Sequence, residues 1–413
     1  MAPRLRIMVY LHSFEPGGVE RVALRLAEAW QAGGADVRVV MGRPDGPQRD
    51  LAPGLQYRFL RDEPGRGGSF ETLRMIARLP REIAAVRPDV LFCAGNTYSI
   101  VALVVRVWLG RQCPPILGKV SNDLDRPDLG LVRRSIRSVW HRLVGRTIDH
   151  FVGMAKPAGT EIASAMKIDR SRISIVNDPA VTLAEIARGA SFRRSRPVGP
   201  GRRFVGVGRL VRQKNFALLI KAFARIAGPD DRLLIAGEGP LRADLEQLAA
   251  DCGVADRVEL PGHIDVLEPW LAASDVFVLS SIFEGVPAVI VEALVAGLPI
   301  VATDCSVSMR TMLDDGALGR LVPLGDAAAL AQAMTQARHL APAVERARAR
   351  ATTFTLDHAA EAYLSVMHRT IADVIGTGRR AVTADARYGS PVFAALPSSL
   401  PTTDTLHCAT LVD

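Results

Sequence analysis

Short apolar runs alternate with longer amphipathic stretches along the first 180 residues. The runs are rich in Val, Ile, Leu and Met, as buried parallel strands are, and they lie at 6–11, 36–41, 89–94, 115–120, 150–154 and 172–176. Between them, the patterns at 18–32 and 70–86 predict helices. Because strands and helices alternate in this way, the sequence predicts an α/β fold with a doubly wound parallel sheet.

A second series of the same kind begins near residue 204. Its predicted strands lie at 203–208, 232–237, 257–262, 276–280, 299–303 and 319–324, and its predicted helices at 215–227, 240–252 and 287–296. Residues 188–203 are rich in Arg, Gly and Pro and lack an apolar period, so we interpret them as a linker. The predicted domains are therefore 1–187 and 204–356. Residues 376–413 mix Ser, Thr, Pro and Gly without a period and are predicted to be disordered.

Composition agrees with a two-domain cytoplasmic protein. The 413 residues exceed what one hydrophobic core usually supports. The five cysteines form no CxxC pair, which indicates a reducing compartment without structural zinc. The first apolar run is only a strand long, so it is not a signal peptide, and no run is long enough to cross a bilayer. The net charge of +8 favours anionic partners, but no basic patch with interleaved aromatics appears, so no nucleic acid is expected.

Two glutamates in the run 279–301 are the strongest candidates for a binding site. Glu284 and Gly285 follow a predicted strand and precede a helix, where freed N–H groups and the helix dipole favour a polar ligand. Glu292 lies within an otherwise apolar helix, where a carboxylate is costly unless it is paired. A solvated or salt-bridged helix position is the alternative for either residue alone.

Cations and glycines mark two further strand-to-helix loops. Arg209 and Lys214 lie at the start of a predicted helix, where the dipole disfavours cations, and a bound diphosphate would resolve that conflict. Gly17 and Gly18 follow the first strand, where adjacent glycines let the backbone approach a phosphate closely. A surface pair of cations and a simple tight turn are the respective alternatives.

These segments together resemble one known family. E-x7-E in SSIFEGVPAVIVEALVAGLPIVAT, with FEPGGVERV, GVGRLVRQKNFALLIKAF and the stretch 233–262, resembles the retaining glycosyltransferases of family four. The resemblance implies the GT-B architecture, two Rossmann-like domains facing across a cleft. It also implies that residues 357–375 form a helix returning to the first domain.

The resemblance assigns roles around a nucleotide diphosphate sugar such as a UDP-sugar. Glu284 would engage the sugar and Glu292 the ribose, while Arg209 and Lys214 would hold the diphosphate. The remaining donor-binding residues implied by the resemblance are Gly17, Gly18, Glu238, His263, Ile264, Gly285 and Val286.

The acceptor side departs from the family pattern. Many relatives carry a histidine after a middle strand of the first domain, where this chain has Ser121-Asn122-Asp123-Leu124-Asp125. Asp123 could orient the acceptor hydroxyl, or it could simply cap a loop. Asp123 and Asp125 also match the D-x-D of metal-dependent transferases, but the other motifs belong to a metal-independent fold, so neither a metal nor a cofactor is expected.

Residues 131–147 predict a basic amphipathic helix. Its apolar positions include Ile136, Val139, Trp140, Leu143 and Val144, and five arginines occupy the remaining surface. Such a helix could dock on an anionic membrane surface, or it could pack on its own sheet with a solvated basic face.

The sequence therefore predicts a retaining, metal-independent glycosyltransferase in the cytoplasm, peripheral to the inner face of the membrane. The acceptor would be a glycan or a polyprenyl-diphosphate-linked glycan of surface polysaccharide, capsule or lipopolysaccharide. A sugar-nucleotide epimerase of similar architecture and a catalytically silent scaffold are the alternatives.

Overall fold

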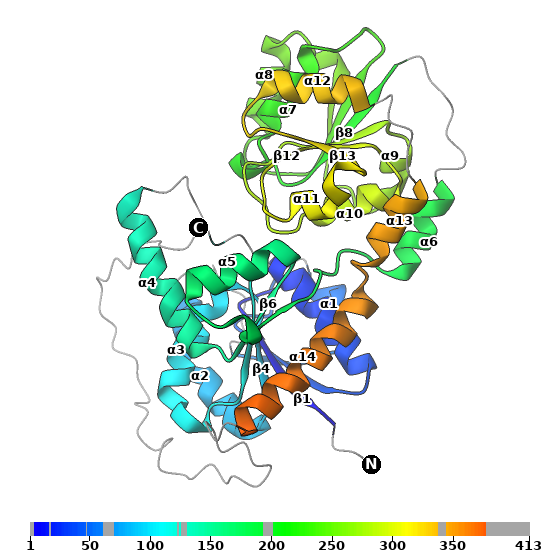
Figure 1. Ribbon diagram of the computed structural model, residues 1–413. Helices are drawn as coiled ribbons and strands as arrows, with labels where there is room; N and C mark the ends of the chain where they lie inside the picture. The colour runs from blue at the N-terminus through cyan, green and yellow to red at the C-terminus, as the bar shows by residue number, and fades with distance from the viewer. Residues whose placement is uncertain are drawn as a thin grey trace.

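A computed structural model describes residues 4–15, 18–46, 48–60, 70–121, 124, 130–192, 201–337 and 344–376. Two α/β domains follow one another along the chain (Figure 1). The strands of the N-terminal domain are β1 (Arg6–Leu11), β2 (Asp36–Met41), β3 (Gln56–Phe59), β4 (Val90–Cys93), β5 (Ile116–Lys119), β6 (His150–Gly153) and β7 (Ile173–Ile175). Its helices are α1 (Gly18–Ala32), α2 (Phe70–Val86), α3 (Ser99–Leu109), α4 (Leu131–Thr147) and α5 (Lys156–Met166).

The C-terminal domain repeats this plan. Its strands are β8 (Arg203–Val207), β9 (Arg232–Ala236), β10 (Val258–Gly262), β11 (Val276–Leu279), β12 (Ile300–Thr303) and β13 (Gly319–Val322). Its helices are α7 (Phe216–Ala224), α8 (Arg242–Asp251), α9 (Glu268–Ala272), α10 (Ala288–Val295), α11 (Met309–Met312), α12 (Ala327–Ala337) and α13 (Val344–Thr352). Two more helices connect the domains, α6 (Leu183–Phe192) and α14 (Leu356–Gly376).

Both sheets are parallel, and the first six strands of each domain follow the same order. The first sheet runs β3-β2-β1-β4-β5-β6-β7 and the second runs β10-β9-β8-β11-β12-β13. In each sheet the order reverses beside the first strand of the domain, between β1 and β4 and between β8 and β11. Loops that leave the carboxyl ends of the strands diverge at such a reversal and leave a crevice for a ligand. The doubly wound fold expected from the sequence is therefore confirmed.

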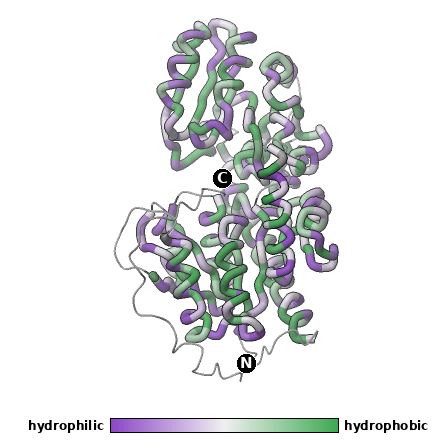
Figure 2. The backbone as a smooth tube through the Cα atoms, turned by 90° about the vertical axis from the view of Figure 1, so that its left-hand side faces the viewer, coloured by the Kyte–Doolittle hydropathy of each residue, from purple (hydrophilic) through white to green (hydrophobic). Residues whose placement is uncertain are grey.

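The strands appear in the sequence as continuous apolar runs because they are buried on both faces of the sheet. The strands β4, β5, β6, β11 and β12 are buried at every position, because helices cover both faces of each sheet. Figure 2 shows hydrophobic segments in green and hydrophilic segments in purple through both domains. The edge strand β3 alternates exposed and half-buried residues and was missed in the sequence.

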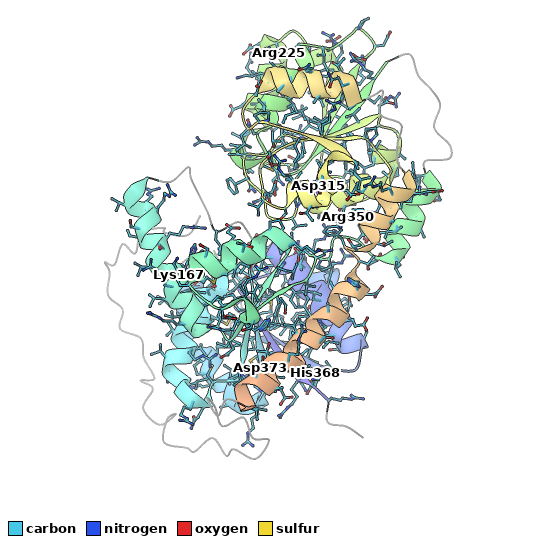
Figure 3. The ribbon with its side chains drawn as sticks, viewed as in Figure 1. Lys167, Arg225, Asp315, Arg350, His368 and Asp373 are labelled. Carbon is cyan, nitrogen blue, oxygen red and sulfur yellow. The ribbon has the colours of Figure 1, made fainter. Side chains whose placement is uncertain are left out.

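An aromatic cluster attaches α14 to the N-terminal domain. The ring centroids of Trp30 on α1 and Phe92 on β4 lie 5.1 Å apart, and Tyr363 on α14 lies 5.9 Å from Trp30. Trp30 Nε1 donates to the carbonyl oxygen of Ala360 at 3.2 Å. In Figure 3, His368 and Asp373 on α14 lie over the N-terminal domain, whereas Arg350 on α13 lies with the C-terminal domain. The chain thus crosses between the domains a second time just before α14.

One sequence interpretation needs correction, and two predictions lie largely outside the described residues. Residues 188–192, taken as the start of an irregular linker, belong to helix α6, whose apolar residues pack against the C-terminal domain. Residues 193–200 and 377–413, which cover the rest of the predicted linker and nearly all of the predicted tail, lie outside the described residues.

Part of the apolar side of α4 faces solvent. Ile136, Val139 and Leu143 are exposed to 50%, 57% and 43%, although Val144 is buried and Trp140 is half-buried. The first three are spaced as one helical stripe, so they form a face that the domain does not cover. The helix therefore packs on its own domain through Trp140 and Val144, as one alternative expected, while Ile136, Val139 and Leu143 stay exposed.

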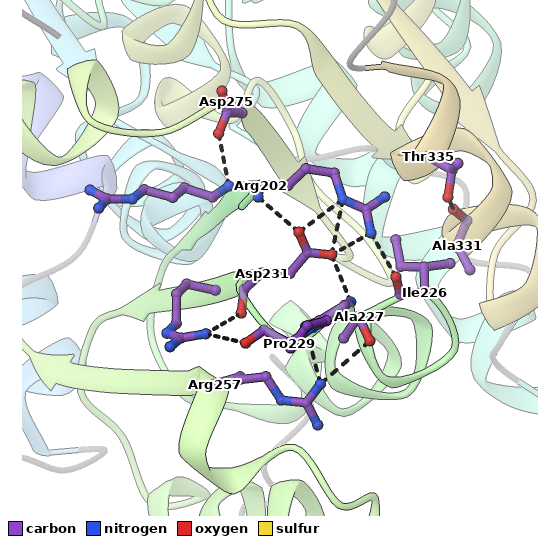
Figure 4. Close-up of polar contacts among 12 residues, drawn as sticks. Arg202, Ile226, Ala227, Pro229, Asp231, Arg257, Asp275, Ala331 and Thr335 are labelled. Carbon is purple, nitrogen blue, oxygen red and sulfur yellow. Dashed lines mark hydrogen bonds and ion pairs between the residues drawn. The ribbon is translucent and has the colours of Figure 1, made fainter. Parts of the chain in front are cut away.

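One carboxylate joins the beginnings of β8 and β9. Asp231 accepts hydrogen bonds from the backbone N–H of Arg202 at 2.8 Å, from its Nε at 3.0 Å and from the N–H of Gly228 at 2.8 Å (Figure 4). Burial raises the pKa of Asp231, but these hydrogen bonds outweigh burial and hold the pKa at about 2. A carboxyl group whose pKa is depressed on folding stabilises the protein above its unfolded pKa, about 3.9, and that stability is lost as the pH falls through the folded value.

Replacing Asp231 by Asn should therefore lower the free energy of unfolding of the C-terminal domain by about 1–3 kcal/mol at pH 7, because buried donors lose a charged acceptor. The difference from the wild type should shrink between about pH 4 and pH 2. Scanning calorimetry over this pH range measures both. The control is Asp256→Asn, which removes an exposed carboxylate beside Arg257 and should change stability by no more than about 0.5 kcal/mol. A wild-type advantage at pH 7 that persists undiminished at pH 2 would contradict the assignment.

Candidate functional site

The strand-order reversal of the second sheet brings Lys214 and Glu284 together. Lys214 ends the 3₁₀ turn η6 (Arg212–Lys214) after β8, and Glu284 lies in the loop after β11. β8 and β11 are hydrogen-bonded neighbours in the sheet. Lys214 Nζ lies 2.6 Å from Glu284 Oε1, and both side chains are largely buried. Two of the residues chosen from the sequence, 70 positions apart, thus form one ion pair.

Hydrogen bonds fix the turn that carries Glu284. Ser281 Oγ donates to Glu284 Oε1 at 2.7 Å, and the Glu284 N–H donates to the carbonyl oxygen of Cys305 at 3.1 Å. Gln213 Nε2 donates to the carbonyl oxygen of Phe283 at 2.9 Å, which ties the turn to η6. Burial, followed by the charge of Glu284, raises the pKa of Cys305 to about 12, so this thiol stays protonated and is no nucleophile. The three hydrogen bonds of the turn therefore hold the Glu284 carboxylate in a fixed orientation.

Gly285 is the point where the N-terminal domain meets this turn. A Cβ atom at Gly285 would lie 2.5 Å from the carbonyl oxygen of Ser121 and 2.6 Å from Cε of Met154. Real Cβ atoms do not approach other atoms so closely, so only glycine fits without displacing the backbone after β5. Ser306 Oγ donates to the Gly285 carbonyl at 2.8 Å. Glu284 therefore lies where the carboxyl ends of both sheets converge.

Arg209 lies on the rim of the same crevice. It is exposed, and none of the residues that the structure describes forms an ion pair with its guanidinium. Gly208, beside it, has a φ of 154°, and a Cβ there would lie 3.0 Å from Cε of Lys214. The loop after β8 therefore presents one buried cation, Lys214, and one accessible cation, Arg209.

The other predicted donor residues of the second domain lie beyond the ends of β9 and β10, in the loop before α10 and on α10. Glu238 is exposed and pairs with Arg242 at 3.1 Å. His263 is exposed and lies 3.3 Å from Asp265, and Ile264 and Val286 are half-buried.

Glu292 borders a cavity of about 110 Å³ between the domains. The cavity is also lined by Asp265, in the loop after β10, and by Arg21 on α1. Burial raises the pKa of Glu292, and the positive charge of Arg21 is the largest influence against that rise. A residue of the N-terminal domain therefore helps to keep this carboxylate charged. Glu284 and Glu292 do not share this cavity, so the two glutamates serve different parts of the crevice.

Most of the site residues predicted in the first domain lie outside the described residues. Gly18 begins α1, whereas Gly17, Asp123 and Asp125 lie outside the described residues. Among the residues that the structure does describe, no group of three or more His, Cys, Asp or Glu side chains could hold a metal ion. The predictions made for Gly17 and Asp123 stay predictions.

A polar cluster at the carboxyl edge of the first sheet was missed. Arg43, which follows β2, lies 2.8 Å from Glu15 and 3.0 Å from Asp45, and its Nε lies 2.8 Å from Glu71. Burial, with the charge of Arg43, lowers the pKa of His12 to about 4, so this histidine is neutral at pH 7. Both Arg43 and His12 lie directly beyond the ends of strands, which is the signal in the sequence that could have identified them.

Two family models match the chain, one on each domain. A model described as a glycosyl transferase 4-like domain matches residues 17–178, and a model described as glycosyl transferases group 1 matches residues 201–339.

Similar proteins agree over most of the chain. The lipopolysaccharide core biosynthesis glycosyltransferase LpsE of Rhizobium meliloti is 26% identical over 337 residues, which are 80% of this chain and 88% of that protein. The phosphatidyl-myo-inositol mannosyltransferase of Mycobacterium leprae is 27% identical over 79% of this chain and 85% of its own. The crystal structure of Anabaena HepE in complex with UDP and glucose has a TM-score of 0.68 at 18% identity, over 91% of this chain and 100% of HepE, which shows a common fold.

These matches confirm the resemblance drawn from the E-x7-E and glycine-rich motifs, and the paired parallel sheets confirm the architecture that it implied. The chain therefore belongs to the group 1 glycosyltransferases and has their two-domain GT-B fold.

Proposed function

We propose that this glycosyltransferase transfers a sugar from a nucleotide diphosphate sugar, with retention of anomeric configuration and without a metal, to a lipid-linked glycan of surface polysaccharide or lipopolysaccharide. The observation that carries the donor assignment is the ion pair between Lys214 and Glu284 at the strand-order reversal. It provides a cation for a diphosphate and a carboxylate for sugar hydroxyls at one point. HepE, with the same fold, was crystallised with UDP and glucose.

When the donor binds, Lys214 and Glu284 would give up their contact with each other and each would contact the donor instead. An incoming diphosphate takes Lys214 as its counterion, with Arg209 as a second, bidentate cation at the rim. Glu284, still held by Ser281, then accepts hydrogen bonds from hydroxyls of the sugar. Glu292 accepts hydrogen bonds from hydroxyls of the ribose within its cavity.

The chemical step then needs no side-chain base. The bond between the anomeric carbon and the phosphate oxygen breaks, and the diphosphate leaves with the electron pair. The acceptor oxygen attacks the same face of the sugar, and its proton passes to the departing phosphate oxygen. Lys214 and Arg209 stabilise the negative charge that develops on the leaving group.

The acceptor assignment rests on α4 and on the relatives. The names of the two relatives above place them in lipopolysaccharide core synthesis and on phosphatidyl-myo-inositol. None of the described helices is long and apolar enough to cross a membrane. The exposed stripe of α4, Ile136, Val139 and Leu143, is flanked by exposed arginines, a charge pattern complementary to an anionic lipid surface. We propose that α4 docks the enzyme on the cytoplasmic face of the membrane.

Replacing Lys214 by Ala should weaken binding of the nucleotide diphosphate by about 1.5–3 kcal/mol, the contribution of a hydrogen bond to a charged group. Isothermal titration calorimetry with UDP, GDP and dTDP measures the loss and identifies the preferred nucleotide. The matched control is Lys221→Ala, which removes an exposed lysine of α7 and should leave affinity unchanged. Equal affinity of Lys214→Ala and wild type for every nucleotide would refute the diphosphate role.

Glu284→Gln should reduce the rate of sugar transfer at least tenfold while changing the affinity for the free nucleotide much less, because Glu284 meets the sugar. Glu292→Gln should instead weaken free nucleotide and nucleotide sugar alike, because Glu292 meets the ribose. Initial rates together with calorimetry separate the two patterns. A Glu284→Gln enzyme that retains full activity would show that its assigned role is wrong.

The membrane assignment predicts sedimentation with anionic vesicles at low salt and not with neutral ones, because each arginine near an anionic surface contributes about 1 kcal/mol and salt screens this attraction. Changing Arg133, Arg142 and Arg146 together to Gln should release the protein, since all three are exposed. Arg137 is left unchanged because its Nε donates to the Leu124 carbonyl at 3.3 Å. Replacing exposed Leu324 of the C-terminal domain by Ser is the control for general surface effects. Persistent sedimentation of the triple variant would exclude α4 as the docking surface.

A further inference from the structure

A second, larger cavity lies between α4 and α5. Its volume is about 520 Å³, and its polar lining consists mainly of Arg134, Ser138, His141, Thr160, Glu161 and Ser164. The two helices stand side by side at one margin of the N-terminal domain (Figure 1). None of these residues belongs to the donor motifs described above.

The loop after β5 connects this cavity to the donor turn. Leu124 borders the cavity, and its backbone is held on both sides: Arg137 Nε donates to its carbonyl oxygen at 3.3 Å, and its N–H donates to Glu161. Ser121, three residues earlier, is the residue whose carbonyl meets Gly285. Three residues span at most about 10 Å even when fully extended. Leu124, at the border of the cavity, therefore lies within about 10 Å of Ser121, which contacts the donor turn at Gly285.

The lining favours a phosphate ester. Among the described residues that line the cavity, Arg134 and Arg137 supply guanidinium groups and Glu161 supplies a carboxylate. Guanidinium forks match phosphate oxygens in geometry and charge, and the hydroxyls on both helices add donors. Burial, with the charge of Arg137, lowers the pKa of His141 to about 4, so its neutral imidazole adds a hydrogen-bonding group without charge at pH 7.

The same helix carries the exposed apolar stripe. Arg134 and His141 line the cavity, while Ile136, Val139 and Leu143 face solvent. Figure 2 turns the side that carries α4 toward the viewer. A molecule with an apolar chain, a phosphate ester and a sugar would thus find a matching surface for each part: the stripe, the cavity and the donor turn.

We infer that the cavity between α4 and α5 binds the phosphate or diphosphate ester that joins lipid and sugar in the acceptor. The inference rests on the proposed function, because it places the acceptor sugar beside Glu284. It names the acceptor class as a lipid-linked sugar phosphate rather than a free sugar.

The test is calorimetric titration with inorganic diphosphate. Wild-type protein should show two sites, one weakened at least tenfold by Lys214→Ala at the donor turn and the other weakened at least tenfold by Arg134→Ala. Arg142→Ala is the matched control, because it removes an exposed arginine of the same helix that does not line the cavity, and it should retain both sites. Ser138→Asp, which introduces a negative charge into the cavity, should weaken the second site as well, and thermal melting confirms that each variant is folded.

Farnesyl diphosphate in detergent micelles distinguishes a lipid-linked ester from free phosphate. It should displace inorganic diphosphate from the Arg134-dependent site and bind it more tightly, because its chain reaches the stripe on α4. Equal binding of inorganic diphosphate by Arg134→Ala, Ser138→Asp and Arg142→Ala would overturn the inference, as would failure of farnesyl diphosphate to compete. Absence of only the Lys214-dependent site would contradict the proposed donor role and leave the result for this cavity standing.

Discussion

The ion pair between Lys214 and Glu284 is the interaction on which the site depends. Both side chains are mostly removed from solvent, so neither charge would be tolerated alone, and removing one partner of such a pair typically costs about 3–5 kcal/mol. The pair joins the loops after β8 and β11, the two strands between which the second sheet reverses its order. In the proposed donor complex, a diphosphate replaces the carboxylate as the partner of Lys214, and sugar hydroxyls replace the ammonium as the partner of Glu284. Without a donor, the Lys214 ammonium and the Glu284 carboxylate neutralise each other, so neither buried charge is unpaired.

Gly285 leaves no room for a side chain, and the turn that carries Glu284 packs against the N-terminal domain at this residue. Because the Ser121 carbonyl fills the position that a side chain would occupy, the turn carrying Glu284 lies against the loop after β5. Arg21 makes a similar connection at Glu292, where a cation of the first domain opposes the effect of burial on a carboxylate of the second. Both glutamates of the E-x7-E motif therefore contact the N-terminal domain or feel its charge, so the proposed donor site lies at the boundary between the two domains.

Much of this could be predicted from the sequence, because buried parallel strands leave continuous apolar runs and because strand-to-helix loops collect unusual residues. The strands at 6–11 and 36–41, the helix at 131–147 and the choice of Lys214 and Glu284 as residues of one cleft follow from those two signals. The edge strand Gln56–Phe59 gave no such run, since half of it faces solvent. Helix α6 could not be predicted because an Arg- and Gly-rich segment begins within it and obscures its apolar period. Ser281 and Arg21 could not be assigned, because their roles depend on distances between segments far apart in the chain. The direction of the apolar stripe on α4 was equally open, since a helical pattern does not say which face the domain covers.

A crystal structure of the protein with its nucleotide diphosphate sugar would test the donor roles of Lys214 and Glu284 most directly. Oxygens of the diphosphate should lie within hydrogen-bonding distance of Lys214 Nζ, and a sugar hydroxyl should donate to Glu284. The bond from Ser281 to Glu284 should remain, because it orients the carboxylate in both states. A donor bound elsewhere, with the Lys214–Glu284 pair intact, would contradict the central claim.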